Sequence, residues 1–240
     1  MSAHRDLTRG DDHLRIAPWR GDATTAHLTP ARGRLSTAAV GRSIATLGGT
    51  GYRAAVTSAL GPADAAPFLE AGFSVHERLH VLRSGLDPAP PAMERVPIRR
   101  GRRSDRSHVL ALDAAAFSPF WTLDGPGLVD ALQATPTSRL RVIDLPGGES
   151  GVAAYSVTGR AGSRGYLQRL AVRPSQQRRG LGSAMVTDAV RWLRRWGARE
   201  ILVNTQEHNH AALALYEAMG FRRQTEGLTV LWRSIDEGSG

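Results

Sequence analysis

The sequence predicts an α+β fold in which short strands alternate with amphipathic helices. Apolar runs such as 200–205 (EILVNT) and 228–233 (LTVLWR) have the length and the β-branched content of buried strands. Other segments repeat apolar residues at helical spacing, most clearly from Leu181 onward. A strand–helix–strand pattern also occurs twice, in the first and in the last third of the chain. A chain of 240 residues can bury a substantial core and hold one domain and part of a second.

The first third contains a helix, a strand, a second helix and a second strand. Apolar spacing and glycine boundaries place these four elements at 34–49, 51–60, 63–73 and 76–84.

A proline-rich segment follows, with prolines at 88, 90 and 91. Proline lacks an amide donor and biases its neighbours toward extended chain. We therefore predict a linker over 84–93, a first domain over 1–83 and a second domain over 94–236.

The region after the linker is predicted to be a complete domain of mixed elements. Pro146-Gly147-Gly148 separates two strand-like runs and predicts a hairpin. The predicted helices cover 105–117, 125–135, 181–196 and 210–219, and the predicted strands cover 95–100, 139–145, 151–158, 165–172, 200–205 and 228–233. The residues expected on one face of the first of these helices are Val109, Leu110, Ala114 and Phe117.

The elements of the first third resemble those that end the chain. Each copy is a strand, a helix ending in Glu-Ala-(x)-Gly-Phe, and a strand ending in Arg-Ser. We interpret residues 1–83 as a degenerate half-copy of the second domain, which makes the chain a tandem repeat.

The composition restricts the function classes. No cysteine is present, which excludes disulfides, thiolate zinc sites and cysteine nucleophiles and suits the cytoplasm. No apolar run approaches about 18 residues and the first residues have no signal-peptide pattern, so we expect a soluble, cytoplasmic protein without a membrane partner. The net charge is +9 and every basic residue other than histidine is arginine, which favours a GC-rich genome and a solvated charge over a nucleic-acid partner.

The strongest motif is a glycine turn between a strand and a helix. Glycines at such a turn let the backbone approach phosphate oxygens. A Walker loop requires a lysine, which this chain lacks, and a dinucleotide fingerprint requires a third glycine where Met185 stands. The remaining pattern is Gln177-Arg178-Arg179-Gly180-Leu181-Gly182, a Gln/Arg-x-x-Gly-x-Gly/Ala loop.

With this loop, residues 94–236 resemble the GNAT superfamily of acetyl-CoA-dependent N-acetyltransferases. A second motif, Asn-x-x-Ala-x-x-Leu-Tyr-x-x-x-Gly-Phe, follows in the expected order at Asn209, Ala212, Leu215, Tyr216, Gly220 and Phe221. The resemblance implies a mixed, mostly antiparallel sheet flanked by helices. It also implies an enzyme that transfers an acetyl group from acetyl-CoA to a primary amine by direct attack on the thioester.

The resemblance also implies a donor site. Main-chain amides of the loop would point at the pyrophosphate from a helix N-terminus, and the preceding strand would pair with the pantetheine arm. The residues expected to bind acetyl-CoA are Leu170, Ala171, Val172, Gln177, Arg178, Arg179, Gly180, Leu181, Gly182, Ser183, Asn209 and Tyr216.

Tyr216 matches the family's tyrosine that protonates the departing thiolate, and a main-chain amide, that of Val172, is the expected oxyanion donor. Many relatives carry a glutamate base in the strand over 165–172, but Tyr166, Gln168 and Arg169 are not carboxylates. The base is therefore left open between solvent water and three residues, Glu207, His208 and His210. His208-Asn209-His210 resembles a nuclease triplet, but Asn209 as a helix N-cap explains it better and no metal is expected.

The first copy lacks this chemistry. Leu35 stands where the second glycine would be, after Gly33-Arg34, and Leu69 stands where the second copy has Tyr216. We therefore expect residues 1–83 to be non-catalytic and to cover the catalytic sheet or shape the acceptor site.

The acceptor amine is expected to be a protein N-terminus, a lysine side chain or a small amine. Two other classes stay open, a non-catalytic acyl-CoA-binding regulatory protein and a basic module associated with RNA or the ribosome. The densest basic cluster, which bears on the second class, is Arg99, Arg100, Arg102, Arg103 and Arg106.

Overall fold

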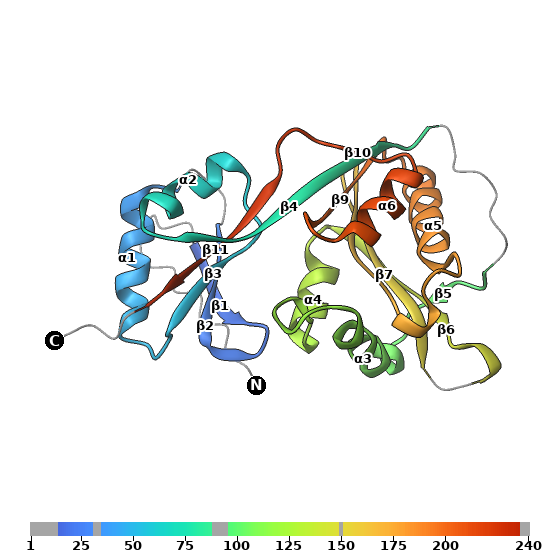
Figure 1. The fold of residues 1–240 in the computed structure, drawn as a ribbon, viewed down its shortest axis with the longest axis horizontal. Helices are drawn as coiled ribbons and strands as arrows, with labels where there is room; N and C mark the ends of the chain where they lie inside the picture. The colour runs from blue at the N-terminus through green and yellow to red at the C-terminus, as the bar shows by residue number, and fades with distance from the viewer. Residues whose placement is uncertain (1–13, 31–34, 88–95, 149–150, 236–240) are drawn as a thin grey trace. The chain divides into compact units, whose positions relative to one another are not determined.

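The computed structural model describes residues 14–30, 35–87, 96–148 and 151–235. The chain forms two compact units, drawn in Figure 1. The first contains the residues up to 81 together with 206–208 and those from 225 onward, and the second contains 82–205 and 209–224.

The first unit has one sheet, and helices α1 and α2 share its apolar core. Its elements are β1 (Leu14–Trp19), β2 (Asp22–Pro30), α1 (Thr37–Gly48), β3 (Ala54–Thr57), α2 (Pro62–Glu70), the first part of β4 (Ser74–Gly85), and β11 (Leu228–Ser234). The strand order is β1-β2-β3-β11-β4, with only β2 and β3 parallel. Val40 and Leu47 of α1 and Phe68 of α2 are fully buried in one apolar cluster with Leu231.

Strands β1 and β2 are not among the elements predicted above. Leu14 and Ile16 are buried while Arg15 between them is exposed, which is the period-two alternation of a half-buried strand. This signal is present in the sequence, but it is short and is interrupted by Pro18.

The last strand of the chain, β11, lies in the first unit between β3 and β4. Val230 and Leu231 are buried there, and the Leu231 amide donates to Thr57 Oγ1 at 2.9 Å. The second compact unit therefore stops before β11, whereas the predicted second domain ran to 236. Apolar burial against β3 and β4, which lie far away in the sequence, decides this assignment.

The far end of β4 passes into the second unit in the same way. Leu82 and Arg83 pair with β10 (Arg222–Arg223), and Leu86 is buried with its amide donating to Arg199 O at 3.1 Å. The predicted linker over 84–93 thus begins too early, because 84–86 are part of a strand and a core. Its proline-rich remainder, 88–93, lies outside the described residues.

The second unit has one mixed sheet between two layers of helices. Its other elements are β5 (Arg99–Arg100), α3 (Arg106–Ala116), α4 (Gly125–Gln133), β6 (Thr137–Asp144), β7 (Val152–Ala161), β8 (Arg164–Val172), α5 (Leu181–Arg195), β9 (Glu200–Gln206) and α6 (His210–Ala218). Strands β5 to β8 are antiparallel neighbours, and only β8 and β9 are parallel. This confirms the expected mixed, mostly antiparallel sheet flanked by helices.

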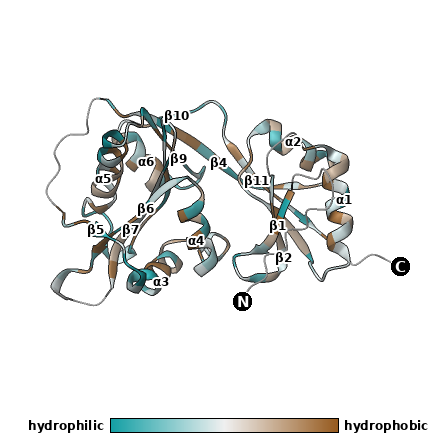
Figure 2. Cartoon of the chain, turned by 180° about the vertical axis from the view of Figure 1, so that it is seen from behind, coloured by the Kyte–Doolittle hydropathy of each residue, from teal (hydrophilic) through white to brown (hydrophobic). Residues whose placement is uncertain are grey.

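Alternate residues of β7 distinguish the two faces of this sheet. Tyr155 and Val157 share an apolar cluster with α3 and α4, whereas Ala154 packs with Met185 of α5 on the other face. Polar and apolar residues alternate along α5 in Figure 2, as expected of a helix with one face on a sheet. No helix within the described ranges is both long and apolar enough to cross a membrane.

Two local predictions differ from the structure. Of the strand expected over 95–100, only Arg99–Arg100 is regular, residues 96–98 have no regular secondary structure, and residue 95 lies outside the described residues. Helix α3 buries Val109, Leu112 and Asp113, while Ala114, expected on that face, is exposed.

Candidate functional site

Strands β8 and β9 open into a gap in the second unit. They pair only through Arg164–Tyr166 and Glu200–Leu202, although β8 continues to Val172 and β9 to Gln206. For the rest of β8, all of it described, the structure records pairing with β7 alone. One edge of β8 is therefore free to bind an extended ligand as an added strand.

The main-chain direction along β8 follows from its register. Gln168 is the extra residue of a bulge opposite β7, and beyond it the pairing is regular up to Val172. The Arg173 amide donates to Ala153 O at 2.8 Å, so by antiparallel alternation Val172 and Leu170 direct their main-chain groups away from β7. Ala171 faces β7 instead. Of the three β8 residues expected at the donor site, two thus present hydrogen-bonding groups to the gap.

The loop between β8 and α5 has two residues in the left-handed region. Arg178 has φ 63° and Gly180 has φ 75°. Gly180 is the N-cap of α5, makes no side-chain cap, and is followed by a first turn without an acidic residue. The amides of Leu181, Gly182 and Ser183 therefore form an open, electropositive helix terminus.

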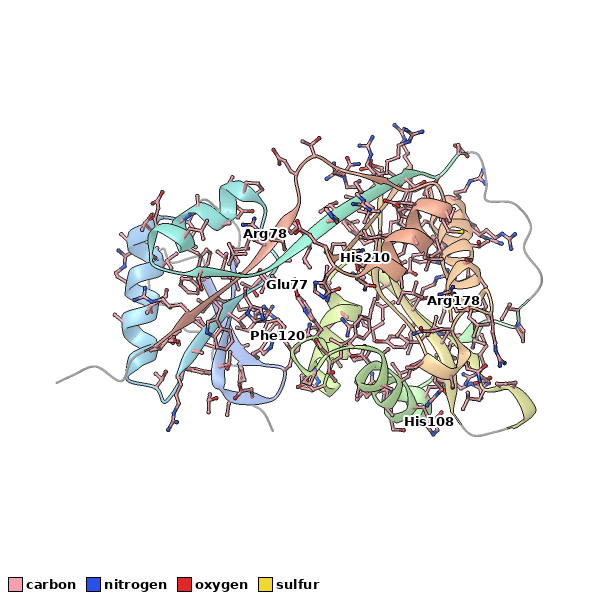
Figure 3. All side chains as sticks on the ribbon, in the orientation of Figure 1. Glu77, Arg78, His108, Phe120, Arg178 and His210 are labelled. Carbon is pink, nitrogen blue, oxygen red and sulfur yellow. The ribbon has the colours of Figure 1, made fainter. Side chains whose placement is uncertain are left out.

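Basic and amide side chains surround this terminus. Arg178, labelled in Figure 3, and Arg179 are exposed, and Arg179 donates to Gln176 Oε1 at 3.2 Å. Gln177 is exposed as well, and its Nε2 donates to Val172 O at 3.2 Å. This hydrogen bond joins the loop to the end of β8.

Helix α6 packs against the start of α5. A Cβ at Gly182 would lie 3.0 Å from Leu215 Cδ2, so the absence of a side chain allows this close approach. The next residue, Tyr216, is 5% exposed and packs on Phe221 with ring centroids 5.6 Å apart.

The Tyr216 phenol is held in its protonated form. Burial raises its pKa well above the ordinary value, although the Arg169 guanidinium acts in the opposite direction. Within the described residues the structure records no hydrogen bond to Tyr216 Oη. The phenol therefore keeps its proton at neutral pH.

Asn209 has a structural role in α6. Its Oδ1 accepts a hydrogen bond from the Ala212 amide at 3.1 Å, which is an N-cap. The side chain expected at the donor site is therefore at least partly used to begin the helix that carries Tyr216.

The three candidate bases are solvent-exposed and differ in their neighbours. His208 Nδ1 lies 3.6 Å from Glu77 Oε1, and the Glu207 amide donates to Arg78 O at 3.1 Å. Glu207 and His208 belong to the first unit together with these neighbours, whereas His210 begins α6 in the second unit (Figure 3). No group of three or more potential metal ligands occurs within the described part of the chain.

Sequence reasoning missed a buried ion pair behind the free edge of β8. The Asp113 carboxylate is fully buried and accepts from Arg169 Nε and Nη2, each at 2.8 Å. Asp113 also accepts from the Tyr155 hydroxyl and, at 2.6 Å, from the Leu123 amide. Asp113 lies four residues after the buried Val109, so its position on the apolar face was the available signal.

The model of the acetyltransferase (GNAT) family matches residues 115–221. The [ribosomal protein bS18]-alanine N-acetyltransferase of Escherichia coli (strain K12) is 34% identical over 74 residues, which are 31% of this chain and 50% of that protein. The mycothiol acetyltransferase of Salinispora arenicola is 33% identical over 175 residues, 68% of this chain and 57% of that protein. The chain thus spans about half the length of these relatives.

A solved tandem GNAT protein from the clavulanic acid biosynthesis pathway has the same fold. The TM-score is 0.69 at 13% sequence identity, and the match covers 94% of this chain and 79% of that one. The match extends over both units and not only over residues 115–221.

Proposed function

Since this chain belongs to the GNAT superfamily through residues 115–221, we propose that it transfers the acetyl group of acetyl-CoA to a primary amine. The observation that carries this proposal is the gap beside β8, which ends at the uncapped N-terminus of α5. An extended, amide-containing arm fits the free edge of β8, and a pyrophosphate fits the uncapped N-terminus of α5.

The chain offers two kinds of group to the donor. The amides of Leu181, Gly182 and Ser183 bind the pyrophosphate, and Arg178 and Arg179 add charge-assisted hydrogen bonds. Leu170 and Val172 pair their main chain with the pantetheine arm. Gln177 supports the loop through Val172 O, and Asn209 supports α6, so both act through other residues.

Acetyl-CoA supplies an activated acyl carbonyl when it is bound. The neutral amine nitrogen attacks this carbonyl carbon while the Val172 amide donates to the carbonyl oxygen. The carbon–sulfur bond breaks, and Tyr216 Oη gives its proton to the departing sulfur. The proton released by the amine passes to solvent, directly or through Glu207, His208 or His210.

The acceptor is a primary amine, and two relatives indicate which amines to test first. One relative is named for a ribosomal protein alanine and the other for mycothiol. An amine panel therefore contains an alanine-terminated peptide, a lysine peptide and small amines. The cysteine-free composition favours a cytoplasmic setting for this reaction.

Ser183 allows a test of the donor site by charge alone. Aspartate at this third helical position stabilises an exposed helix terminus but repels an incoming pyrophosphate. We expect Ser183→Asp to raise the acetyl-CoA dissociation constant at least ~10-fold in calorimetry. Ser183→Asn introduces a side chain of nearly the same shape as aspartate but without the charge, and it is expected to change that constant by less than about 3-fold. Equal binding by both variants would place the pyrophosphate elsewhere. Tight binding without transfer to any amine would favour an acyl-CoA-binding regulatory protein.

We further propose that the first unit binds no acetyl-CoA. Ser36 Oγ accepts from the Ala39 amide at 3.2 Å, so α1 begins with a side-chain cap where α5 has none. Leu69, at the position that corresponds to Tyr216, is 44% exposed and carries no proton donor. Residues 33 and 34, which precede this helix, lie outside the described residues.

A further inference from the structure

A basic groove lies at the opposite end of α5 from the proposed donor loop. Its volume is about 550 Å³, and its walls come from the segment between β5 and α3, from β6, and from the C-terminal half of α5. No acidic residue is among its lining residues. The arginines that line it are Arg100, Arg102, Arg103, Arg106, Arg139 and Arg141.

The arginines at the mouth of this groove are not neutralised. Arg100, Arg103 and Arg106 are exposed, and the structure records no ion pair between them and any described carboxylate. Two of the lining arginines share one carboxylate that is not itself part of the lining, since Asp188 Oδ2 lies 2.6 Å from Arg139 Nη2 and 3.4 Å from Arg141 Nε. The groove therefore carries a strong positive potential that an anion would relieve.

Two tryptophans of α5 complete the lining. The Arg139 guanidinium stacks over the Trp192 ring at 4.7 Å from its centroid. Trp196, one turn further along the helix, is 55% exposed. An exposed indole beside several arginines provides a flat apolar platform within reach of bound phosphates.

The segment that carries these arginines is held in a defined shape. Arg99 makes paired hydrogen bonds to Asp105 at 2.8 Å and also binds Asp144 at 2.5 and 2.7 Å. A Cβ at Gly101 would clash with Leu140 Cγ, so the absence of a side chain lets this segment lie close against β6, where the Gly101 amide donates to Leu140 O at 2.9 Å. The groove is therefore preformed and does not depend on a ligand for its shape.

This groove is separate from the acyl-donor loop. Trp196 follows Leu181, the first residue of α5, by 15 positions. At about 1.5 Å per residue the two ends are roughly 22 Å apart. The arginines of the groove do not contribute to the pyrophosphate site proposed above.

We propose that this groove binds single-stranded nucleic acid. The arginines contact successive phosphates and Trp196 stacks on a base, which is the combination used by proteins that bind single strands. Arginine's weakly hydrated, planar group suits both contacts. An acidic polypeptide would match the charge but would leave the exposed indole without a partner.

The test is fluorescence anisotropy of the full chain with labelled single-stranded RNA and DNA oligonucleotides of mixed sequence, measured over a range of salt concentrations. We expect the triple variant Arg100→Ala, Arg103→Ala, Arg106→Ala to bind at least ~10-fold more weakly and to lower the salt slope by about 2. Trp196→Ala is expected to weaken binding about 5- to 10-fold at unchanged salt slope. The RNA and DNA arms identify which nucleic acid is preferred.

A matched control removes the same charge elsewhere. Arg53, Arg199 and Arg222 are exposed and do not line the groove, so their triple alanine variant is expected to bind within about 3-fold of the parent chain. Unchanged acetyl-CoA binding by the groove variants shows that they are folded. The proposal fails if the two triple variants lose equal affinity. It also fails if Trp196→Ala binds normally while polyglutamate displaces the oligonucleotide, since an acidic protein would then be the ligand.

Discussion

Arg169 and Asp113 form a two-pronged ion pair inside the second unit, 56 residues apart in the sequence. The guanidinium also donates to Trp121 O at 2.6 Å and lies 3.5 Å from the centroid of the Phe117 ring. Arg169 belongs to β8 next to Leu170, whose main chain faces the gap. The pair therefore ties β8, the free strand of the proposed donor site, to α3 and to the segment that follows it.

Removing the charge of Asp113 is expected to destabilise the protein strongly. Asp113→Asn leaves the Arg169 guanidinium, 12% exposed, without a counter-charge in a region of low dielectric. We expect a loss of about 3–5 kcal/mol in the free energy of unfolding, measured by denaturant titration.

An exposed ion pair provides the control for this variant. Glu217 and Arg223 are 2.7 Å apart and both are 45% exposed, so Glu217→Gln is expected to cost less than about 1 kcal/mol. Replacing both buried partners, as in Asp113→Leu with Arg169→Met, is expected to restore only part of the stability, because the Tyr155 hydroxyl and the Leu123 amide lose their buried acceptor. If Asp113→Asn were as stable as Glu217→Gln, the buried pair would have no part in holding β8.

Tyr216→Phe is expected to separate catalysis from packing. The ring and its contact with Phe221 remain, so the free energy of unfolding changes by no more than about 1 kcal/mol. Turnover falls roughly 10²–10⁴-fold if the phenol protonates the departing sulfur, while the acetyl-CoA dissociation constant stays the same. The measurement is single-turnover acetyl transfer. A Phe variant with the parent rate for the chemical step would make Tyr216 a core residue only.

The first unit is expected to lose stability in mild acid because of His27. Burial, and next the charges of Arg20 and Arg15, lower its pKa from 6.5 to about 4. The unfolded chain therefore binds a proton below about pH 6.5 that the folded chain does not, and stability falls as the pH drops from 6.5 toward 4.

Because of this histidine, we expect the free energy of unfolding to fall by about 2 kcal/mol between pH 7 and pH 4.5. His27→Phe keeps a ring against Trp19 and removes the titrating group. The difference in unfolding free energy between the two pH values should shrink by that amount in the variant. An identical pH dependence in both proteins would mean that His27 is accessible to protons in the folded state.

Leu82 tests whether β4 is needed by the second unit. It is fully buried in the cluster that also contains Leu193 and Tyr216, although the strand that carries it begins in the first unit. Leu82→Ala is expected to cost about 2–5 kcal/mol, whereas Leu69→Ala, at a 44% exposed position, costs less than about 1 kcal/mol. Thermal unfolding of both variants gives the comparison. Similar melting temperatures would show that the second unit does not depend on β4.

The sequence by itself determined the features that depend on neighbouring residues. The spacing of Met185, Ala189 and Leu193 identified α5, and the glycines at 180 and 182 identified the turn before it. Asn209 was recognised as an N-cap because a cap involves only the next three residues. The strand–helix alternation and the two motifs then sufficed to predict the fold class and the family.

The tertiary structure alone decided the features that join distant segments. Nothing in the sequence near Leu228 indicates that β11 lies between β3 and β4, because strand partners are selected by the summed burial of both faces of a sheet. The gap beside β8 exists because pairing with β9 stops after Tyr166, which no local pattern marks. Asp113 and Arg169 have no local relation either, because they are 56 residues apart in the sequence. A buried charge is tolerated only beside a partner of opposite charge, and only folding brings these two side chains together.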